Sequence, residues 1–246
     1  MSDTLVIIPT YNEKENIEAI IRAVFSLPKP FHVLVVDDGS PDGTGAIVKG
    51  LQSQYPEALF LLERTQKSGL GRAYIAGFEW ALQRDYEYVM EMDADFSHNP
   101  ADLPHLYDAC AVKGADVAVG SRYKVGVNVV NWPIGRVLMS YFASKYVRLI
   151  TGMNIADTTA GFVCYHRKVL ETIGLDNICF VGYAFQIEMK FTAYKYGFKI
   201  VEVPIVFVNR ELGVSKMNSG IFGEALTGVV RLKWRSLFRS YKREEA

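Results

Sequence analysis

The sequence has 246 residues, half of them apolar, which suffices for one large domain or two small ones around a sizeable buried core. Lys and Arg together number 27, as do Asp and Glu, so the net charge is zero. This balance excludes the strong basic excess of a general nucleic-acid-binding protein, and we expect no nucleic-acid partner.

The three cysteines, Cys110, Cys164 and Cys179, lie far apart and form no Cys-x-x-Cys pair. They predict neither a disulfide framework nor a structural zinc site, and we expect reduced, buried thiols in a cytosolic protein. The N-terminus leads directly into a strand-like run, so we expect no signal peptide. No apolar stretch reaches the ~18 residues that a membrane-spanning helix needs.

The first half of the chain alternates short apolar runs with helical patterns. The runs are typical of strands buried on both faces, and they cover residues 5–8, 33–36, 59–62, 88–92 and 116–119. Helical spacing of apolar residues separates them, as in Ile17, Ile20, Ile21 and Val24. Further helices are expected after Asp42-Gly43-Thr44, after Gly69-Leu70-Gly71 and over residues 100–112.

This alternation predicts an α/β fold with a mostly parallel, Rossmann-like central sheet flanked by helices. Ligands of such sheets bind beyond the carboxyl ends of the strands. Polar residues follow the strands at 10–13, 37–38, 93–95 and 121–122. We therefore expect several carboxylates to converge on one crevice.

Asp93 and Asp95 end the fourth run, and their spacing of two places them on the same side of an extended backbone. Two carboxylates at a strand end can hold Mg²⁺ or Mn²⁺ against a diphosphate. The alternative is a solvated turn. Asp37 and Asp38 have two interpretations also: acceptors for a ribose or base, or part of the turn that Gly39-Ser40-Pro41 builds.

The remaining polar candidates carry weaker signals. The segment Gly69-Leu70-Gly71 lacks a full G-x-G-x-x-G pattern, so we expect its glycines to let a helix start close to another backbone rather than bind a dinucleotide. Lys67 could face the crevice. His98 neighbours the acidic pair, but a surface or capping role is favoured over metal ligation. The cations singled out for phosphates are Arg122, Arg136, Arg210 and Lys216.

The second half predicts helices over residues 134–150 and 185–194, a turn-rich link at 157–162 and strands at 199–204 and 205–208. The tail, 221–241, combines an apolar face with a basic face formed by Arg231, Arg235, Arg239 and Lys242. This pattern fits a helix lying in a membrane interface, or a helix packed on the core with a solvated basic face.

Five motifs occur in order along the chain: residues 9–13 (Pro-Thr-Tyr-Asn-Glu), 37–44 (Asp-Asp-Gly-Ser-Pro-Asp-Gly-Thr), 69–71, 92–98 (Met-Asp-Ala-Asp-Phe-Ser-His) and 120–123 (Gly-Ser-Arg-Tyr). The ordered set resembles family 2 glycosyltransferases with the GT-A fold. The segments 132–136 and 202–204, with Ser140, Arg210 and Ser215-Lys216, narrow the resemblance to polyprenol (dolichyl) phosphate mannosyltransferases. It extends from Leu5 to about Ser219.

The resemblance implies a role for each matching residue. The nucleoside would be bound by Pro9, Tyr11, Glu13, Val36 and Asp38. The ribose, diphosphate and metal would be held by Asp93, Ala94 and Asp95, with Asp95 the principal metal ligand. The donor phosphates would contact Arg122, Arg210 and Lys216. The lipid phosphate would be received by Arg136 and Ser140. The family's basic residue after Gly-Phe is replaced by Val163.

The implied activity is a metal-dependent, inverting transfer of a hexose from a nucleotide sugar, with GDP-mannose as the expected donor, to a polyprenyl phosphate. Asp95 and Arg122 would be catalytic, and Mg²⁺ or Mn²⁺ the cofactor. We expect one glycosyltransferase domain, with a donor half (1–122), an acceptor half (123–218) and a basic amphipathic helix (219–246). Its place would be peripheral, on the cytoplasmic face of a membrane, through the tail, the loop 125–132 or an anchoring partner subunit.

Three alternatives remain open at the level of sequence. A UDP-glucose or other nucleotide-hexose donor would leave the fold and the acceptor unchanged. A sugar-phosphate nucleotidyltransferase would require a glycine-rich, basic signature after the first strand, where Pro9-Thr10-Tyr11 stands instead. A nucleotide-sugar-binding module without turnover is disfavoured because the acids and cations are all present.

Overall fold

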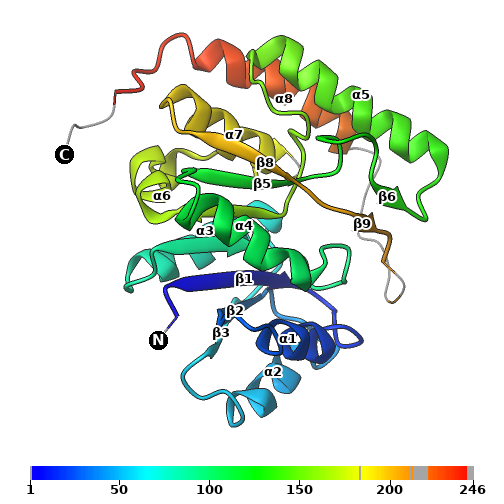
Figure 1. The fold of residues 1–246 in the computed structure, drawn as a ribbon, viewed down its shortest axis with the longest axis vertical. Coiled ribbons are helices and arrows are strands. Elements are labelled where there is room, and N and C mark those ends of the chain that lie inside the picture. Colours follow the sequence, from blue (N-terminus) through cyan, green and yellow to red (C-terminus); the bar gives the residue numbers. More distant parts are fainter. Residues whose placement is uncertain (1, 183, 211, 213–220, 243–246) are drawn as a thin grey trace.

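A seven-stranded sheet forms the centre of the computed structural model, in the order β3-β2-β1-β4-β7-β5-β8 (Figure 1). The structure describes residues 2–182, 184–210, 212 and 221–242, and for 221–226 the helix without side chains. The strands are β1 (Thr4–Thr10), β2 (His32–Asp37), β3 (Leu59–Glu63), β4 (Tyr88–Glu91), β5 (Val117–Ser121), β7 (Val163–His166) and β8 (Ile200–Pro204). Only β7 runs antiparallel to its neighbours in this sheet, which confirms the predicted mostly parallel α/β fold.

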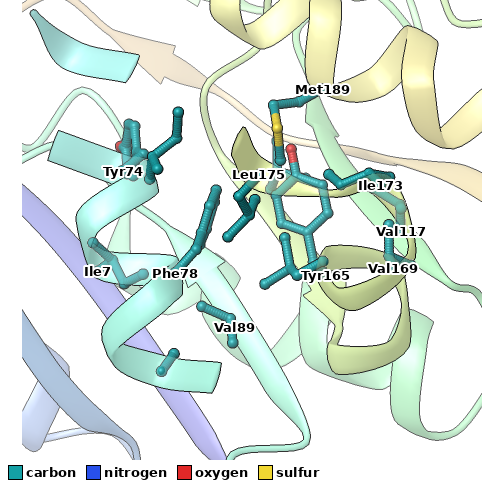
Figure 2. Packing of buried hydrophobic residues seen from close by; sticks show 14 of the residues in the cluster. Ile7, Tyr74, Phe78, Val89, Val117, Tyr165, Val169, Ile173, Leu175 and Met189 are labelled. Carbon is teal, nitrogen blue, oxygen red and sulfur yellow. The ribbon is translucent and has the colours of Figure 1, made fainter. Parts of the chain in front are cut away.

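Helices cover both faces of the sheet. Along β1, Leu5 and Ile7 join one core cluster and Val6 and Ile8 the other, as the period of two along a strand requires. The first cluster includes residues of α3 (Leu70–Leu82), α6 (Arg167–Ile173) and α7 (Ala184–Lys195). Figure 2 shows part of it, with Tyr165 of β7 packed between helices. The second includes residues of α1 (Ile17–Phe25), α2 (Thr44–Gln52) and α4 (Leu103–Ala111).

Two further helices form an outer layer above α7, namely α5 (Ile134–Thr151) and α8 (Ile221–Arg235) (Figure 1). Val147 of α5, Phe191 of α7 and Val229 and Leu232 of α8 share a third buried cluster. A small two-stranded sheet of β6 (Val129–Val130) and β9 (Phe207–Val208) lies beside the end of α5. The outer layer and this small sheet close over the carboxyl edge of the main sheet.

Four details differ from the sequence-based expectations. Residues 205–208 do not extend the main sheet, because the chain leaves it after Pro204 and pairs with β6 instead. Strand β7 was not predicted, since its four residues show no alternation. The tail helix ends at Arg235, six residues before the expected end. Cys179 is exposed, whereas Cys110 and Cys164 are buried as expected.

The structure explains why Val163 can stand where the family has a basic residue. Val163 belongs to β7 and is fully buried in the first core cluster. An apolar side chain therefore suits this position in this chain.

In the described part of the chain, no helix combines the length and apolar character needed to cross a bilayer.

Gly77 of α3 gives the fold a direct test. A Cβ at this position would lie 2.7 Å from Cγ2 of Ile7, which is locked in the sheet. Gly→Ala in an open helix position stabilises by roughly 1 kcal/mol, but overpacking a core costs roughly 1–3 kcal/mol. We expect Gly77→Ala to lower the free energy of unfolding in urea. Gly50→Ala in α2, with no atom within 4 Å, should raise it; equal effects of the two changes would contradict the α3–β1 packing.

Candidate active site

The carboxyl ends of β1, β2, β4 and β5 open into a cavity of about 510 Å³ between the sheet and the outer helices. The structure brings together there most of the residues singled out from the sequence, from segments far apart in the chain. The predicted residues that line it are Pro9, Tyr11, Glu13, Asp38, Asp93, Ala94, Asp95, Arg122, Arg136, Ser140 and Arg210. The expected crevice at this edge of the sheet is therefore present.

One predicted residue, Val36, does not line the cavity. Helices cover both faces of the sheet and the Val36 side chain is fully buried in the first core cluster, so a side-chain contact with a nucleoside is excluded, and a contact through its backbone stays a prediction. Lys216 lies outside the described residues. Lys67, the weaker candidate, does line the cavity, with its Nζ 4.7 Å from the centre of the Tyr11 ring.

The two acids at the end of β2, Asp37 and Asp38, have different roles: one builds the turn and the other faces the cavity. Asp37 builds the turn, because its carboxylate accepts hydrogen bonds from the Thr10 hydroxyl and from both the backbone N–H and the hydroxyl of Ser40. Asp38 faces the cavity and pairs with Arg64 at 2.8 Å. Burial raises the pKa of Asp38, and Arg64 opposes that rise.

Asp95 is fixed by the turn that follows it. Its Oδ1 accepts hydrogen bonds from the backbone N–H of Ser97 at 3.1 Å and from the Ser97 hydroxyl at 2.5 Å. Phe96, between them, adopts a left-handed φ of 59°, an uncommon conformation for a bulky residue that turns Ser97 back onto the carboxylate. Burial alone would raise the pKa of Asp95, but Ser97 and Arg210 together hold it below its ordinary value.

The electrostatic surroundings of Asp93 disfavour its charged form, in contrast to those of Asp95. Burial and the neighbouring Asp95 carboxylate raise the pKa of Asp93 to about 7. The backbone N–H of Asp93 donates to Nδ1 of His98, whose ring stacks on Phe162 with centroids 4.8 Å apart. Burial lowers the pKa of His98 to about 4, so its ring is neutral near pH 7. The surface position expected as one alternative for His98 is wrong, because the residue is buried and its ring accepts a backbone hydrogen bond.

Arg210 is the cation in contact with this acidic group. Its Nη2 lies 2.5 Å from Oδ2 of Asp95, and its Nη1 lies 3.7 Å from Oε1 of Glu13. The preceding residue, Asn209, accepts a hydrogen bond from Nη1 of Arg136 at 3.0 Å. The end of β9 therefore connects the acidic side of the cavity with the side lined by α5.

Arg122 is held from behind by residues that the sequence did not single out. Its Nε and Nη2 donate to the two oxygens of Asp157 at 2.6 Å each, and its backbone N–H donates to the same carboxylate. Thr159 accepts a further bond from Nη2. Burial alone would raise the pKa of Asp157, but the Arg122 guanidinium holds this pKa below its usual range. The turn-rich link at 157–162 thus orients Arg122 toward the cavity.

A second buried polar group supports the cavity floor. The side chain of Gln186 on α7 donates to Glu91 at 2.8 Å and accepts from Lys190 at 3.4 Å. Lys190 also donates to the carbonyl of Ala160 at 2.6 Å. Burial raises the pKa of Glu91 and lowers that of Lys190. Sequence patterns did not reveal this group, because α7 is buried all round and its polar residues stand without any motif.

The glycines at the start of α3, Gly69 and Gly71, let the helix begin close to another backbone, as predicted. The N–H of Gly71 donates to the carbonyl of Val181 at 2.8 Å. A Cβ on Gly71 would lie 2.9 Å from the carbonyl oxygen of Phe180. No larger residue fits at this start of the helix without a shift of the backbone of residues 180–181.

The far end of the cavity is apolar. Between α5, α7 and α8 it is lined by Met139, Ala143, Val147, Ile187 and Val229. Where this arm meets the polar part stand Ser140 and Arg136, with the guanidinium of Arg136 4.0 Å from the centre of the Trp132 ring. The cavity therefore offers an anionic cluster, several guanidinium groups and an apolar arm in sequence.

The donor set fits a divalent cation that is shared with a substrate. Within the described part of the chain, no group of three or more His, Cys, Asp or Glu has the arrangement of a metal site. Mg²⁺ in phosphate-handling enzymes is commonly held by one or two carboxylates, with phosphates and water completing the shell. Asp95 and Asp93 are the described residues that could hold it in this way.

Comparison with known proteins shows the family to which the chain belongs. Residues 5–174 match the model of glycosyl transferase family 2. A polyprenol monophosphomannose synthase from Mycolicibacterium smegmatis is 50% identical over 223 residues, which cover 91% of this chain and 84% of the relative. An undecaprenyl-phosphate mannosyltransferase from Micrococcus luteus is 46% identical over 237 residues, 95% of this chain and 96% of the relative.

Solved structures share the fold at low sequence identity. Glucosyl-3-phosphoglycerate synthase from Mycobacterium tuberculosis, in complex with Mn²⁺, UDP and its product, superposes with a TM-score of 0.67 at 16% identity, over 96% of this chain and 80% of that one. A mannosyltransferase from Pyrobaculum calidifontis, in complex with GDP-Man and Mn²⁺, superposes with a TM-score of 0.61 at 21% identity. The match covers 97% of this chain and 64% of that one.

The chain has the GT-A fold that these solved structures share. More narrowly, the chain belongs to glycosyl transferase family 2. It is an enzyme, and the resemblance read from the five ordered motifs is confirmed.

The Arg122–Asp157 pair generates a stability prediction. Removing one partner of a buried pair costs about 3–5 kcal/mol, so Asp157→Asn should lower the free energy of unfolding in urea by about 3 kcal/mol at pH 7. The lowered pKa of Asp157 contributes stability above the ordinary carboxyl pKa of about 3.9. That contribution is lost as pH falls through the lower folded value, so the difference from wild type should shrink in acid.

The matched control for this prediction is Glu63→Gln. Glu63 pairs with Lys49 at 2.7 Å, but both side chains are 55% exposed. Exposed pairs contribute about 0–1 kcal/mol, so this variant should unfold nearly as the wild type does. A loss no greater for Asp157→Asn than for Glu63→Gln would contradict the role given to the buried pair.

Proposed function

We propose that this enzyme transfers a mannosyl group from GDP-mannose to a polyprenyl phosphate, with inversion at the anomeric carbon and with Mg²⁺ or Mn²⁺ as cofactor. The observation that carries the proposal is one cavity lined by the Asp93–Asp95 cluster, by three arginines and by an apolar arm. The names of the two relatives that are 46–50% identical support the donor sugar and the lipid class.

The donor would occupy the side of the cavity formed by β1, β2 and β4. Tyr11 and Asp38 stand at the ends of β1 and β2, where the nucleoside would lie, and Pro9, Glu13 and Ala94 complete that wall. The diphosphate would then reach Asp93 and Asp95. Arg122, Arg210 and, by resemblance, Lys216 would contact its phosphates. This division assigns residues 1–122 mainly to the donor and residues 123–218 mainly to the acceptor.

The acceptor phosphate would enter from the α5 side. Arg136 and Ser140 are one helical turn apart on the same face of α5, so both can meet one phosphate group. The apolar arm beyond them, between α5 and α8, suits the first isoprenoid units. A polyprenol without phosphate would lack the group that Arg136 recognises.

The chemistry then requires little proton transfer. A phosphate oxygen of the acceptor, already anionic, attacks the anomeric carbon from the face opposite the leaving group, and the bond between that carbon and the diphosphate breaks. A divalent cation at Asp95 would supply Lewis-acid stabilisation of the charge that develops on the departing diphosphate. Arg122, oriented by Asp157, adds fixed positive charge at the same place. His98 is not needed as a base: its pKa is about 4 and its Nδ1 already accepts a bond from the protein.

A lipid acceptor also implies contact with a membrane surface. The outer side of α5 exposes a row of large apolar residues, Ile134, Leu138, Phe142 and Leu149, at helical spacing. Trp234, Leu237 and Phe238, at the end of α8 and just beyond it, are exposed as well. We propose that this side lies on the cytoplasmic face of the membrane, beside the mouth of the acceptor arm, with or without an anchoring partner.

The function is tested by incubating the purified protein with polyprenyl phosphate and labelled GDP-mannose, UDP-glucose or UDP-N-acetylglucosamine in Mn²⁺ or Mg²⁺, then extracting lipid. We expect label in the lipid from GDP-mannose alone, and none when polyprenol replaces the phosphate. Asp95→Asn should lower the rate at least about 100-fold, because it removes the carboxylate that would hold the divalent cation against the leaving diphosphate. Asp85→Asn, at an exposed carboxylate before β4, should leave the rate unchanged.

Label from a UDP sugar alone would replace the proposed donor. Near-normal turnover by Asp95→Asn would contradict the role given to the acidic pair. Release of pyrophosphate from a nucleoside triphosphate would indicate a nucleotidyltransferase instead.

The membrane contact is tested by sedimentation with anionic phospholipid vesicles. Burying an exposed Leu or Phe side chain is worth roughly 1.5–3 kcal/mol, so the double change Phe142→Ser and Leu149→Ser should weaken binding at least about tenfold. Val112, 74% exposed at the end of α4, provides the control Val112→Ser, which should bind as the wild type does. Equal binding by all three proteins would place the membrane contact elsewhere.

A further inference from the structure

The guanidinium of Arg210 occupies the centre of an acidic group. Its two terminal nitrogens lie 2.5 Å from Oδ2 of Asp95 and 3.7 Å from Oε1 of Glu13, and its charge also acts on Asp93. The carboxylates of Asp95 and Glu13 are almost wholly enclosed, with side-chain exposures of 6% and 7%. Carboxylates this close together and this poorly hydrated repel one another strongly unless a cation lies between them.

The two oxygens of Asp95 have separate partners. Oδ1 is held by the N–H and hydroxyl of Ser97, which leaves Oδ2 as the oxygen that faces Arg210. A divalent cation binds carboxylate oxygen at about 2.0–2.1 Å for Mg²⁺, with other oxygen ligands around it. If the guanidinium and such a cation both contacted Oδ2, their positive charges would lie only a few ångströms apart, and their repulsion disfavours simultaneous contact.

We propose that Arg210 is an exchangeable counter-cation: in the protein without metal it neutralises Asp95 and Glu13, and it leaves Asp95 Oδ2 when a divalent cation binds there. The proposal rests on the proposed function only for the presence of a divalent cation at this site. Arg210 thereby sets the affinity of the enzyme for its metal, besides any contact that it makes with the donor.

The position of Arg210 in the chain determines where its side chain goes after the exchange. It follows Asn209, whose backbone N–H donates to the carbonyl of Val130 at 3.1 Å and whose side chain accepts from Arg136 at 3.0 Å. These two bonds tie the backbone next to Arg210 to β6 and α5. The released guanidinium therefore stays in the cavity, where the oxygens of a bound diphosphate are its natural partners. Positive charge moves from the carboxylates to the donor without leaving the site.

The test measures Mn²⁺ binding in the absence of nucleotide, by electron paramagnetic resonance of free Mn²⁺ or by calorimetry. Arg210→Gln should bind Mn²⁺ about tenfold more tightly than the wild type, the size of a typical coupling between two ligands of one site. Lys67→Gln removes one positive charge from the same cavity without touching Asp95, and should change the Mn²⁺ affinity much less. Asp95→Asn should bind Mn²⁺ weakly in either background.

The shift in melting temperature on adding Mn²⁺ is a second measurement, which shows whether each variant is folded. Because Arg210→Gln leaves the acids uncompensated, Mn²⁺ should raise its melting temperature more than that of the wild type. Arg210→Lys, which keeps the charge but not the forked contact, should fall between the two in both measurements. Unchanged or weaker Mn²⁺ binding by Arg210→Gln, or an equal gain in Lys67→Gln, would overturn the proposal. Neither readout uses a donor or an acceptor, so absence of mannosyl transfer would leave this result standing.

Discussion

The need to compensate the carboxylates at the carboxyl edge of the sheet shapes most of this molecule. The chain after β1 and β4 places Glu13, Asp93 and Asp95 along one cavity, where burial and mutual repulsion raise the pKa of Asp93 to about 7. Such an arrangement is costly in a folded protein unless cations accompany it. Arg210 supplies one in the structure, and a divalent cation would take its place beside Asp95 in the working enzyme.

The second half of the chain supplies the hydrogen-bond and ion-pair partners of the charged residues in the first half. The link at 157–162 contributes Asp157, which orients Arg122, and α7 contributes Gln186 and Lys190, which support Glu91. The small sheet of β6 and β9 brings Arg210 to the acids and Asn209 to Arg136. The acidic side of the cavity and the side lined by α5 are thus joined through two consecutive residues, Asn209 and Arg210.

Sequence patterns anticipated the fold and the acids better than the supports behind them. Continuous apolar runs revealed the parallel strands, and the spacing of Asp93 and Asp95 placed both acids at one strand end. The antiparallel β7 escaped notice because four buried residues carry no periodic signal. Asp157 and Lys190 were missed because their partners are 35 and 30 residues away in sequence, and only the folded chain brings them together. Val36 was carried over from the family motif, although a continuous apolar run typical of a strand buried on both faces already indicated that its side chain is inside the protein.

The central claim is that the Asp95 carboxylate, now in contact with Arg210, is where the metal and the donor diphosphate meet. A crystal structure with Mn²⁺ and GDP, with data collected for the anomalous signal of manganese, tests it most directly. We predict an anomalous peak within coordination distance of Asp95 Oδ2 and of two diphosphate oxygens, with Arg210 moved from the carboxylate to a phosphate. A manganese peak away from Asp95, or Arg210 still paired with Asp95 beside a bound diphosphate, would contradict the account.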